Sequence, residues 1–200
     1  MSRLAAYYDR DARDLAARYE TVSFGTVHAP ILQFLPPLGG HIADIGAGAG
    51  RDARALSTLG YEVLAVEPSI EMRRQANPST GSGLEWCDDR LPDLRRVRSM
   101  GRRFDFVLCA AVLMHLEAEV LPASFEALAA LLSKTGRLAI SLRDARLGDP
   151  EGLYFDHTPA TVLSAAASAR LDLLAQGSSS DNLARSDVLW RWFVFTLANA

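Results

Sequence analysis

The stretch ADIGAGAGRDARAL, residues 43–56, decides the fold class of this protein. An apolar strand ends at Ile45, a helix begins near Ala49, and the turn between them holds Gly46, Gly48 and Gly50. Glycine accepts a positive φ and leaves no Cβ between the backbone and a ligand. Strand, glycine-rich turn and helix in this order predict the first unit of a doubly wound α/β sheet, with a ligand over the turn.

The segments after this turn alternate between short β-rich runs and helical runs. Five strands are expected at residues 41–46, 62–67, 84–88, 104–110 and 137–143. Helices are expected near residues 49–59, 69–75, 92–100 and 117–132, and Gly136 reads as a stop signal between the last of them and the fifth strand. Strands separated by helices join through right-handed crossovers into a parallel sheet.

The last quarter of the chain follows another pattern. A helix is expected at residues 159–169, followed by two strands at residues 171–177 and 188–197 with a short polar turn between them. Two strands joined directly across a turn pair antiparallel. The expected sheet therefore has five parallel strands and a terminal hairpin.

The residues before the first strand form a helical segment of about 38 residues. Apolar side chains recur at three-to-four spacing from Leu4 to Tyr19, which predicts one face of an amphipathic helix. A second apolar stretch ends at Pro36 and Pro37, which mark a loop. Because no linker or shift in composition divides the chain, we expect residues 1–200 to form a single domain.

Composition limits the class of protein and its partners. The 200 residues contain 49% hydrophobic and 22% charged residues and carry a formal net charge of −3, which fits one ordinary soluble domain. The negative balance argues against nucleic acid as a partner, and the arginines between residues 90 and 103 read as a solvated helix face. The charged amino terminus and the short apolar runs argue against a secretion signal or a membrane partner. We therefore expect a cytoplasmic protein.

The two cysteines, Cys87 and Cys109, each lie in an expected strand and read as buried thiols. Free thiols favour a reducing compartment. Neither the cysteines nor the four histidines show a metal-ligand spacing, so no metal site is predicted.

Carboxylates close the second and third expected strands. Glu67 stands 21 residues after Gly46, a spacing at which a carboxylate accepts from both hydroxyls of a ribose. Asp88 and Asp89 close the third strand and can accept from an exocyclic amine such as that of adenine. Because the carboxyl ends of neighbouring parallel strands share one edge of the sheet, these groups and the glycine turn predict a nucleoside site.

The glycine pattern narrows the choice of nucleoside. A dinucleotide site has the pattern G-x-G-x-x-G, but Arg51 stands where its third glycine would be. Lys134 is the only lysine and lies far from the glycine turn, so no triphosphate-binding loop is present. The pattern disfavours a pyrophosphate cradle, although Glu67 keeps a nicotinamide-dependent oxidoreductase open as an alternative.

The run D-x-G-x-G-x-G from Asp44 to Gly50, the acid after the second strand and the Asp after the third resemble the class I S-adenosylmethionine-dependent methyltransferases of small-molecule type. The resemblance covers about residues 41–143. It implies a Rossmann-like seven-stranded sheet of order 3-2-1-4-5-7-6, with strand 7 antiparallel and helices on both faces. It also implies that about residues 1–38 form a helical lid over the cofactor, S-adenosyl-L-methionine.

The resemblance implies cofactor-binding roles for particular residues. The methionine part would lie on Asp44, on the backbone from Gly46 to Gly48 and, through its amino group, on Ala110. The ribose would lie on Glu67. The adenine would lie between Pro68 and Met72, with its amine on Asp88 or Asp89. The full cofactor-binding set is therefore Asp44, Gly46, Ala47, Gly48, Glu67, Pro68, Met72, Asp88, Asp89 and Ala110.

The segment after the fourth strand, CAAVLMHL, carries the candidate catalytic residue, His115. It lacks the [DN]-P-P-[YF] motif of relatives that methylate exocyclic amines, which disfavours DNA-amine and glutamine methylation. An imidazole at this edge can take a proton from an attacking hydroxyl or amine. Against this role, a His in the first turn of a helix is often only a polar cap. An in-line methyl transfer can also depend on positioning alone, so that no dedicated base is needed.

Several other side chains invite a functional interpretation. Tyr7 lies off the apolar helix face and is a candidate lid residue. The remaining ones read as packing residues: Tyr8, Tyr19, His157, Trp190 and Trp192. We expect a methyltransferase that acts on an oxygen, nitrogen or carbon atom of a small molecule. A nucleoside-binding module without an acceptor site is the second alternative, and the sequence decides neither the acceptor nor whether the protein is a monomer or a homodimer.

Overall fold

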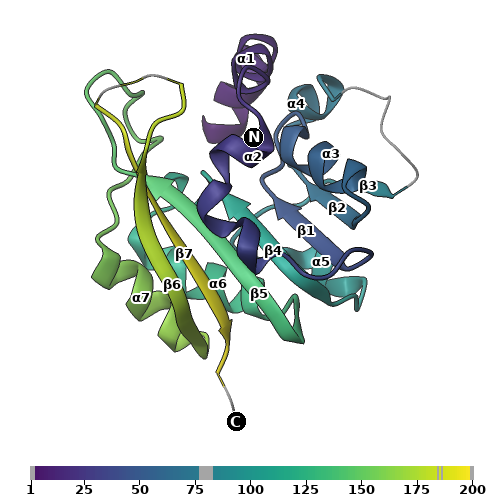
Figure 1. The fold of residues 1–200 in the computed structure, drawn as a ribbon. Helices are drawn as coiled ribbons and strands as arrows, with labels where there is room; N and C mark the ends of the chain where they lie inside the picture. The colour runs from purple at the N-terminus through teal and green to yellow at the C-terminus, as the bar shows by residue number, and fades with distance from the viewer. Residues whose placement is uncertain (1–2, 77–82, 184, 186, 199–200) are drawn as a thin grey trace.

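The computed structural model describes residues 3–76, 83–183, 185 and 187–198. One seven-stranded sheet forms its centre, with the strand order β3-β2-β1-β4-β5-β7-β6 (Figure 1). The strands are β1 His41–Ile45, β2 Glu62–Val66, β3 Leu84–Cys87, β4 Phe104–Ala110, β5 Leu132–Arg143, β6 Leu171–Ser180 and β7 Leu189–Leu197. β7 pairs antiparallel with both β5 and β6, whereas β1 to β5 run parallel. The predicted fold class and strand order are confirmed.

Helices cover both faces of this sheet (Figure 1). The α-helices are α1 Arg3–Tyr19, α2 Phe24–Val27, α3 Arg51–Thr58, α4 Ile70–Arg74, α5 Arg95–Ser99, α6 Leu121–Ala129 and α7 Pro159–Ser168. Short 3₁₀ turns are η1 Ala29–Phe34, η2 Leu113–His115 and η3 Ala118–Val120. None of the helices in the described part of the chain is both long and apolar enough to cross a bilayer.

The boundary between α6 and β5 differs from the sequence prediction. α6 ends at Ala129 and β5 already begins at Leu132, so Gly136 lies inside a strand and is not a stop between two elements. A Cβ on Gly136 would lie 2.7 Å from the carbonyl oxygen of Phe104, and the register between β4 and β5 shifts at this point. Glycine is therefore needed here for close backbone approach within the sheet.

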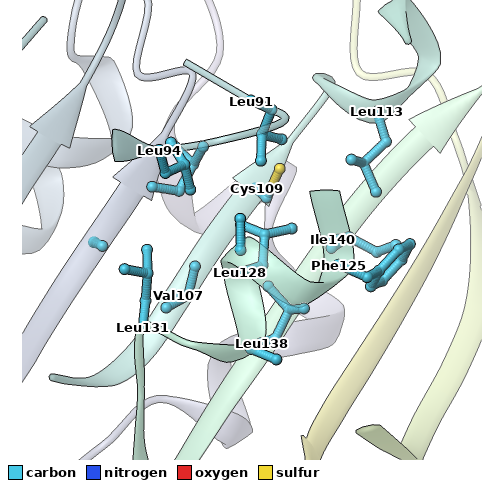
Figure 2. Packing of buried hydrophobic residues seen from close by; sticks show 14 of the residues in the cluster. Leu91, Leu94, Val107, Cys109, Leu113, Phe125, Leu128, Leu131, Leu138 and Ile140 are labelled. Carbon is cyan, nitrogen blue, oxygen red and sulfur yellow. The ribbon is translucent and has the colours of Figure 1, made fainter. Parts of the chain in front are cut away.

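The apolar core lies on the two faces of the sheet. On one face, α5, α6 and α7 bury a cluster around Val107, Cys109, Phe125 and Leu138 (Figure 2). On the other face, α2, η1 and α3 bury a cluster that includes Phe106. Both faces of the central strands are apolar because a parallel sheet is covered on both sides.

Many elements end at the edge of the sheet that is formed by the carboxyl ends of the parallel strands. The carboxyl ends of the parallel strands point to it, and α1 lies across it next to α4 (Figure 1). Asp9 of α1 accepts a hydrogen bond from the Ser69 hydroxyl at the start of α4, at 2.5 Å. At the other end of the edge, an Arg3 guanidinium nitrogen donates to the Glu151 carbonyl at 3.3 Å. Within the expected lid, α1 is thus attached at both ends of this edge, whereas α2 and η1 pack on a face of the sheet.

Candidate active site

A cavity of about 470 Å³ opens along this edge, under α1. Its walls include Gly46 after β1, Glu67 after β2, Ala110 at the end of β4 and Ser141 in β5. Tyr8 of α1 forms part of the cover. This volume is typical of sites that bind a small molecule or a cofactor.

The glycine turn after β1 shapes one wall of the cavity. Gly46 and Gly48 have φ angles of 77° and 57°, which other residues adopt only with strain. A Cβ on Gly46 would lie 2.3 Å from Cγ2 of Val112, and one on Gly48 would lie 3.2 Å from Cε of Met72. Conformation therefore favours glycine at both positions, and at Gly46 the close packing against Val112 requires it as well.

The backbone amides of this turn already have partners at the end of β2. The amides of Gly46 and Ala47 donate to the Val66 carbonyl at 2.8 and 3.0 Å. The amide of Gly48 donates to Oε2 of Glu67 at 2.9 Å. Because these three amides are engaged, they are not free to bind an anionic ligand, and the turn suits a ligand that brings its own donor, such as an ammonium group.

Glu67 lies in the cavity wall with a fixed carboxylate. Its Oε2 accepts from Gly48 and its Oε1 accepts from the amide of Ser69 at 2.7 Å. Burial raises the pKa of Glu67, and the two amide hydrogen bonds oppose that rise. Each carboxylate oxygen has a second lone pair, so the orientation set by the amides leaves acceptor capacity for two ligand hydroxyls.

Asp44, at the end of β1, is buried beneath the glycine turn and does not line the cavity. Its Oδ2 has no hydrogen-bond partner. Burial raises the pKa of Asp44 well above its ordinary value, and the neighbouring carboxylate of Asp52 raises it further. A cation held above the turn would relieve this unpartnered carboxyl, which fits the positive amino group of a methionine moiety.

The structure separates the two acidic residues after β3. Asp89 lies in the cavity wall, and its Oδ2 accepts from the amides of Arg96 and Val97 at 2.8 and 3.0 Å. Asp88 does not line the cavity, and its half-exposed side chain pairs with Arg73 at 3.5 Å and with Arg96 at 3.7 Å. Of the two candidates for the adenine amine, Asp89 is the one at the cavity.

The remaining predicted cofactor residues line the cavity. Pro68 and Met72 follow β2 and line the wall next to Glu67. Met72 is almost fully buried, because α4 turns it inward against Gly48. Ala110 ends β4 opposite them. Backbone, carboxylate and apolar groups thus occur together along the ends of β1, β2 and β4.

His115 lies in the turn η2, which follows β4, and its side chain lines the cavity. Its Nδ1 is 2.6 Å from the Leu153 carbonyl, which can only accept, so Nδ1 carries a proton. Its Nε2 is 2.9 Å from the hydroxyl of Tyr8. Burial lowers the pKa of His115 to about 4, so the ring is neutral at pH 7 and Tyr8 donates to Nε2.

The segment after Asp149 holds the turn η2 in place. The amide of Phe155 donates to the Met114 carbonyl at 2.8 Å. The buried ring of His157 lies with its Nε2 3.2 Å from the Leu113 carbonyl and 3.0 Å from the Leu116 carbonyl. His157 is therefore a structural residue that fixes the turn, and it takes no place in the cavity wall.

Sequence reasoning missed most of the side chains at the far end of the cavity. Tyr8 lines the cavity, whereas Tyr7, the predicted lid residue, does not. Other cavity-lining residues that were read as packing or passed over are Tyr19, Ser141, Arg143, Tyr154, Trp190 and Trp192. The alternation of Trp190 and Trp192 along β7 was the available signal, but a strand face predicts packing and a binding surface equally well.

No group of three or more His, Cys, Asp or Glu side chains among the described residues could hold a metal ion. The cavity offers backbone groups, carboxylates, aromatic rings and the Tyr8–His115 pair. These groups fit a nucleoside with a positively charged amino-acid substituent. They fit a pyrophosphate poorly, because the amides from Gly46 to Gly48 are occupied.

Residues 42–136 match a family model described as a methyltransferase domain. This stretch of the chain is a methyltransferase domain. Together with the sheet order, this match supports the family that the sequence predicts, the class I methyltransferases. No curated protein matches the sequence significantly.

Solved structures with this fold include methyltransferases and one cyclase. Magnesium protoporphyrin IX methyltransferase from Synechocystis PCC 6803 with bound SAH has a TM-score of 0.69 at 19% identity, covering 94% of this chain and 86% of that one. A Burkholderia thailandensis 1,6-didemethyltoxoflavin-N1-methyltransferase has a TM-score of 0.67 at 17% identity, covering 100% and 92%. The [4+2]-cyclase SpnF has a TM-score of 0.74 at 12% identity, covering 98% and 96%. At identities this low, the likeness shows the fold alone.

Proposed function

We propose that this methyltransferase acts on a small molecule bound between α1 and the ends of β5, β6 and β7. One observation carries the proposal: a single cavity joins the groups around Glu67 to the Tyr8–His115 pair and then to the aromatic residues of β7. A nucleoside-binding module without an acceptor site would not need this second half.

The residues at the carboxyl ends of β1, β2 and β4 would hold S-adenosylmethionine. Glu67 would accept from the ribose hydroxyls, and the buried carboxyl of Asp44 would balance the amino group of the methionine part. Pro68 and Met72 would pack on the adenine next to Asp89. When bound, this cofactor supplies an electrophilic methyl group on a positively charged sulfur atom.

The Tyr8–His115 pair would take the proton that the acceptor loses. The neutral Nε2 of His115 accepts from the Tyr8 hydroxyl, and the Leu153 carbonyl holds the opposite nitrogen in its donor form. A proton that arrives at the Tyr8 oxygen can therefore pass on to Nε2 without any change of tautomer. His115 and Leu153 are buried, and the low local dielectric strengthens the hydrogen bonds of the ring.

We also propose a cytoplasmic location, supported by the two free, buried thiols at Cys87 and Cys109. Neither nucleic acid nor a membrane is part of the proposed activity. A small-molecule acceptor agrees with the size of the cavity, about 470 Å³ for both halves together.

Ligand-dependent stability tests this proposal directly. A ligand that binds only the folded state at 100 times its Kd stabilises the fold by about 2.7 kcal/mol. S-adenosylhomocysteine should therefore raise the melting temperature by several degrees, and NADH should not. Formation of S-adenosylhomocysteine from S-adenosylmethionine should then require an added acceptor. A shift with NADH and none with S-adenosylhomocysteine would refute the proposal.

A further inference from the structure

The floor of the far half of the cavity is built by paired strands. In the register of the sheet, Trp192 of β7 lies between Ser141 of β5 and Gly177 of β6. A Cβ on Gly177 would lie 2.5 Å from Cζ2 of Trp192, so the indole ring lies against the bare backbone of β6. Small neighbours on both sides leave the ring of Trp192 as a flat surface.

A second Trp of β7 lies two residues from Trp192. This residue, Trp190, lies between Arg143 of β5 and Ser179 of β6. Its Nε1 donates to Oδ1 of Asp181 at 2.9 Å, which fixes the orientation of the indole. Both indole rings line the cavity, Trp190 beside the cluster around Phe125 and Trp192 beside the cluster that includes Phe106, and we call these two residues the indole floor.

Other flat groups line the same part of the cavity as the indole floor. The Arg143 guanidinium carbon lies 4.3 Å from the ring centroid of Tyr154. The ring of Tyr154 lies 4.6 Å, centroid to centroid, from the ring of His115. Guanidinium planes and aromatic rings both stack well on planar ligands.

The charges at this end of the cavity are paired within the protein. Arg143 makes two hydrogen bonds with the carboxylate of Asp149, at 2.7 and 3.0 Å. Arg185 makes two with the carboxylate of Asp181, at 2.9 and 2.6 Å. With these carboxylates engaged, the surface offers little attraction to an ammonium ligand, and an uncharged one fits it best.

Resting on the methyl transfer proposed above, we propose that the acceptor is an uncharged planar aromatic compound with a hydroxyl group, stacked on the indole floor with its hydroxyl at Tyr8. In the transfer, the bond between the methyl carbon and sulfur breaks and leaves its electron pair on sulfur, and the hydroxyl oxygen forms the new bond to carbon. The hydroxyl proton passes to Tyr8 while Tyr8 gives its own proton to Nε2 of His115. The products are an aryl methyl ether, S-adenosylhomocysteine and an imidazolium that returns the proton to solvent.

Three probes that differ in one property each test this assignment. The protein, saturated with S-adenosylhomocysteine, is titrated by calorimetry with 1-naphthol, with trans-1-decalol, which has the same carbon skeleton without the flat rings, and with 1-naphthylmethylamine, which is an ammonium ion at pH 7. Each aromatic contact is expected to favour a flat ring by about two- to tenfold. We expect 1-naphthol to bind at least about tenfold more tightly than either of the others. Equal or tighter binding of the decalol or the ammonium compound would overturn the proposal.

Two substitutions of Trp190 distinguish a loss of stacking from a general loss of structure. Both Trp190→Phe and Trp190→Leu lose the hydrogen bond to Asp181, but only the first keeps an aromatic ring. The ratio of 1-naphthol to decalol affinity should persist in Trp190→Phe and fall to about threefold or less in Trp190→Leu. An unchanged ratio in a folded Trp190→Leu variant contradicts the indole floor as the binding surface.

Glycine substitution gives a second, independent readout. Gly177→Ala should push the Trp192 ring into the cavity and weaken 1-naphthol binding by about tenfold, with S-adenosylhomocysteine affinity unchanged. Gly25→Ala is the matched control, because a Cβ there meets nothing within 4 Å. If S-adenosylhomocysteine itself fails to bind the native protein, the proposed function fails; if it binds but 1-naphthol is not preferred, only the acceptor class fails.

Discussion

The two halves of the cavity are built in different ways. The cofactor half, around Gly46 and Glu67, consists of backbone and carboxylates that follow directly on the ends of adjacent parallel strands. The acceptor half, around Tyr8 and Trp190, collects side chains from α1, β5, β7 and the loops between them. Each group of the cofactor half stands directly at the end of a strand. The acceptor half forms only when segments that are distant in the sequence pack together.

The two halves of the cavity therefore differ in the substitutions that they tolerate. Substitutions in the cofactor half alter positions fixed by backbone conformation, as the 2.3 Å approach of a Cβ on Gly46 to Val112 illustrates. The acceptor half depends on side chains whose identity can vary without moving the strands. We therefore expect variants of the two halves to affect cofactor affinity and turnover separately.

The largest effect should come from His115→Ala. Removing the proton acceptor should lower kcat by roughly 10²–10⁴, with the Kd for S-adenosylhomocysteine nearly unchanged. Turnover on a competent acceptor, measured beside calorimetry of cofactor binding, checks this result. If His115 is only a structural residue, its loss should instead appear as about 1 kcal/mol of stability with turnover preserved.

The pH dependence of kcat in the native enzyme tests the same role of His115 as proton acceptor. Burial lowers the pKa of His115 to about 4, and the groups around it are Tyr8, Tyr154, Arg143 and Asp149. Because the neutral ring is the active form, kcat should stay level as pH falls from 7 to 5 and decline only as it approaches about 4. A decline centred near 6.5, the ordinary value for histidine, would contradict the buried, neutral ring.

Glu67→Ala should change the cofactor half alone. The loss of charge-assisted hydrogen bonds worth roughly 1.5–3 kcal/mol each should weaken S-adenosylhomocysteine binding at least about tenfold. Calorimetry measures the affinity, and Glu71→Ala is the matched control, since that carboxylate pairs with Arg74 on the surface of α4. Unchanged affinity in a folded Glu67→Ala variant would show that the ribose lies elsewhere.

Tyr8→Phe should lower kcat by about tenfold, less than the histidine variant, because Nε2 of His115 would still accept a proton directly from the acceptor. The ring remains in place, so cofactor affinity should hold. Tyr7→Phe provides the control: the neighbouring hydroxyl does not line the cavity, and its removal should leave kcat at the native value. Equal turnover in both variants would remove Tyr8 from the proton path.

The smallest effects concern two buried carboxyls with opposite pKa shifts. Asp44 has its pKa raised by burial, so its ionised form destabilises the fold as pH rises above the unfolded value of about 3.9. Burial also raises the pKa of Asp52, but the interactions with His28 and Arg51 outweigh this effect, so the pKa of Asp52 is lowered. The ionised Asp52 therefore stabilises the fold at pH values above about 3.9, and this stabilisation is lost as the pH falls toward its lowered pKa.

At pH 7, Asp44→Asn should therefore raise the free energy of unfolding by about 1 kcal/mol, or roughly 2–4 °C in Tm, while weakening cofactor binding. Asp52→Asn should lower stability, because it leaves the buried His28 ring without its charged partner at 2.8 Å. Thermal unfolding of both variants checks the signs. A loss of stability in Asp44→Asn equal to that in Asp52→Asn would show that Asp44 is paired in the folded protein.

The cofactor half could be predicted from sequence because its signals are local. Gly46, Gly48 and Glu67 each stand at a fixed distance from a recognisable strand, and a parallel sheet places such strand ends side by side. The choice between Asp88 and Asp89 could not be made in this way. It depends on the start of α5, whose amides at Arg96 and Val97 bind one of the two carboxylates.

Only the tertiary structure decided the acceptor half. Tyr8 and His115 are 107 residues apart, and His115 and Leu153 are 38 apart, so no spacing in the sequence links them. The register of β7 between β5 and β6 likewise determines that Trp190 and Trp192 form one floor. Sequence periodicity identifies which residues share a face of their own element, whereas the contacts between elements arise only from packing the whole chain.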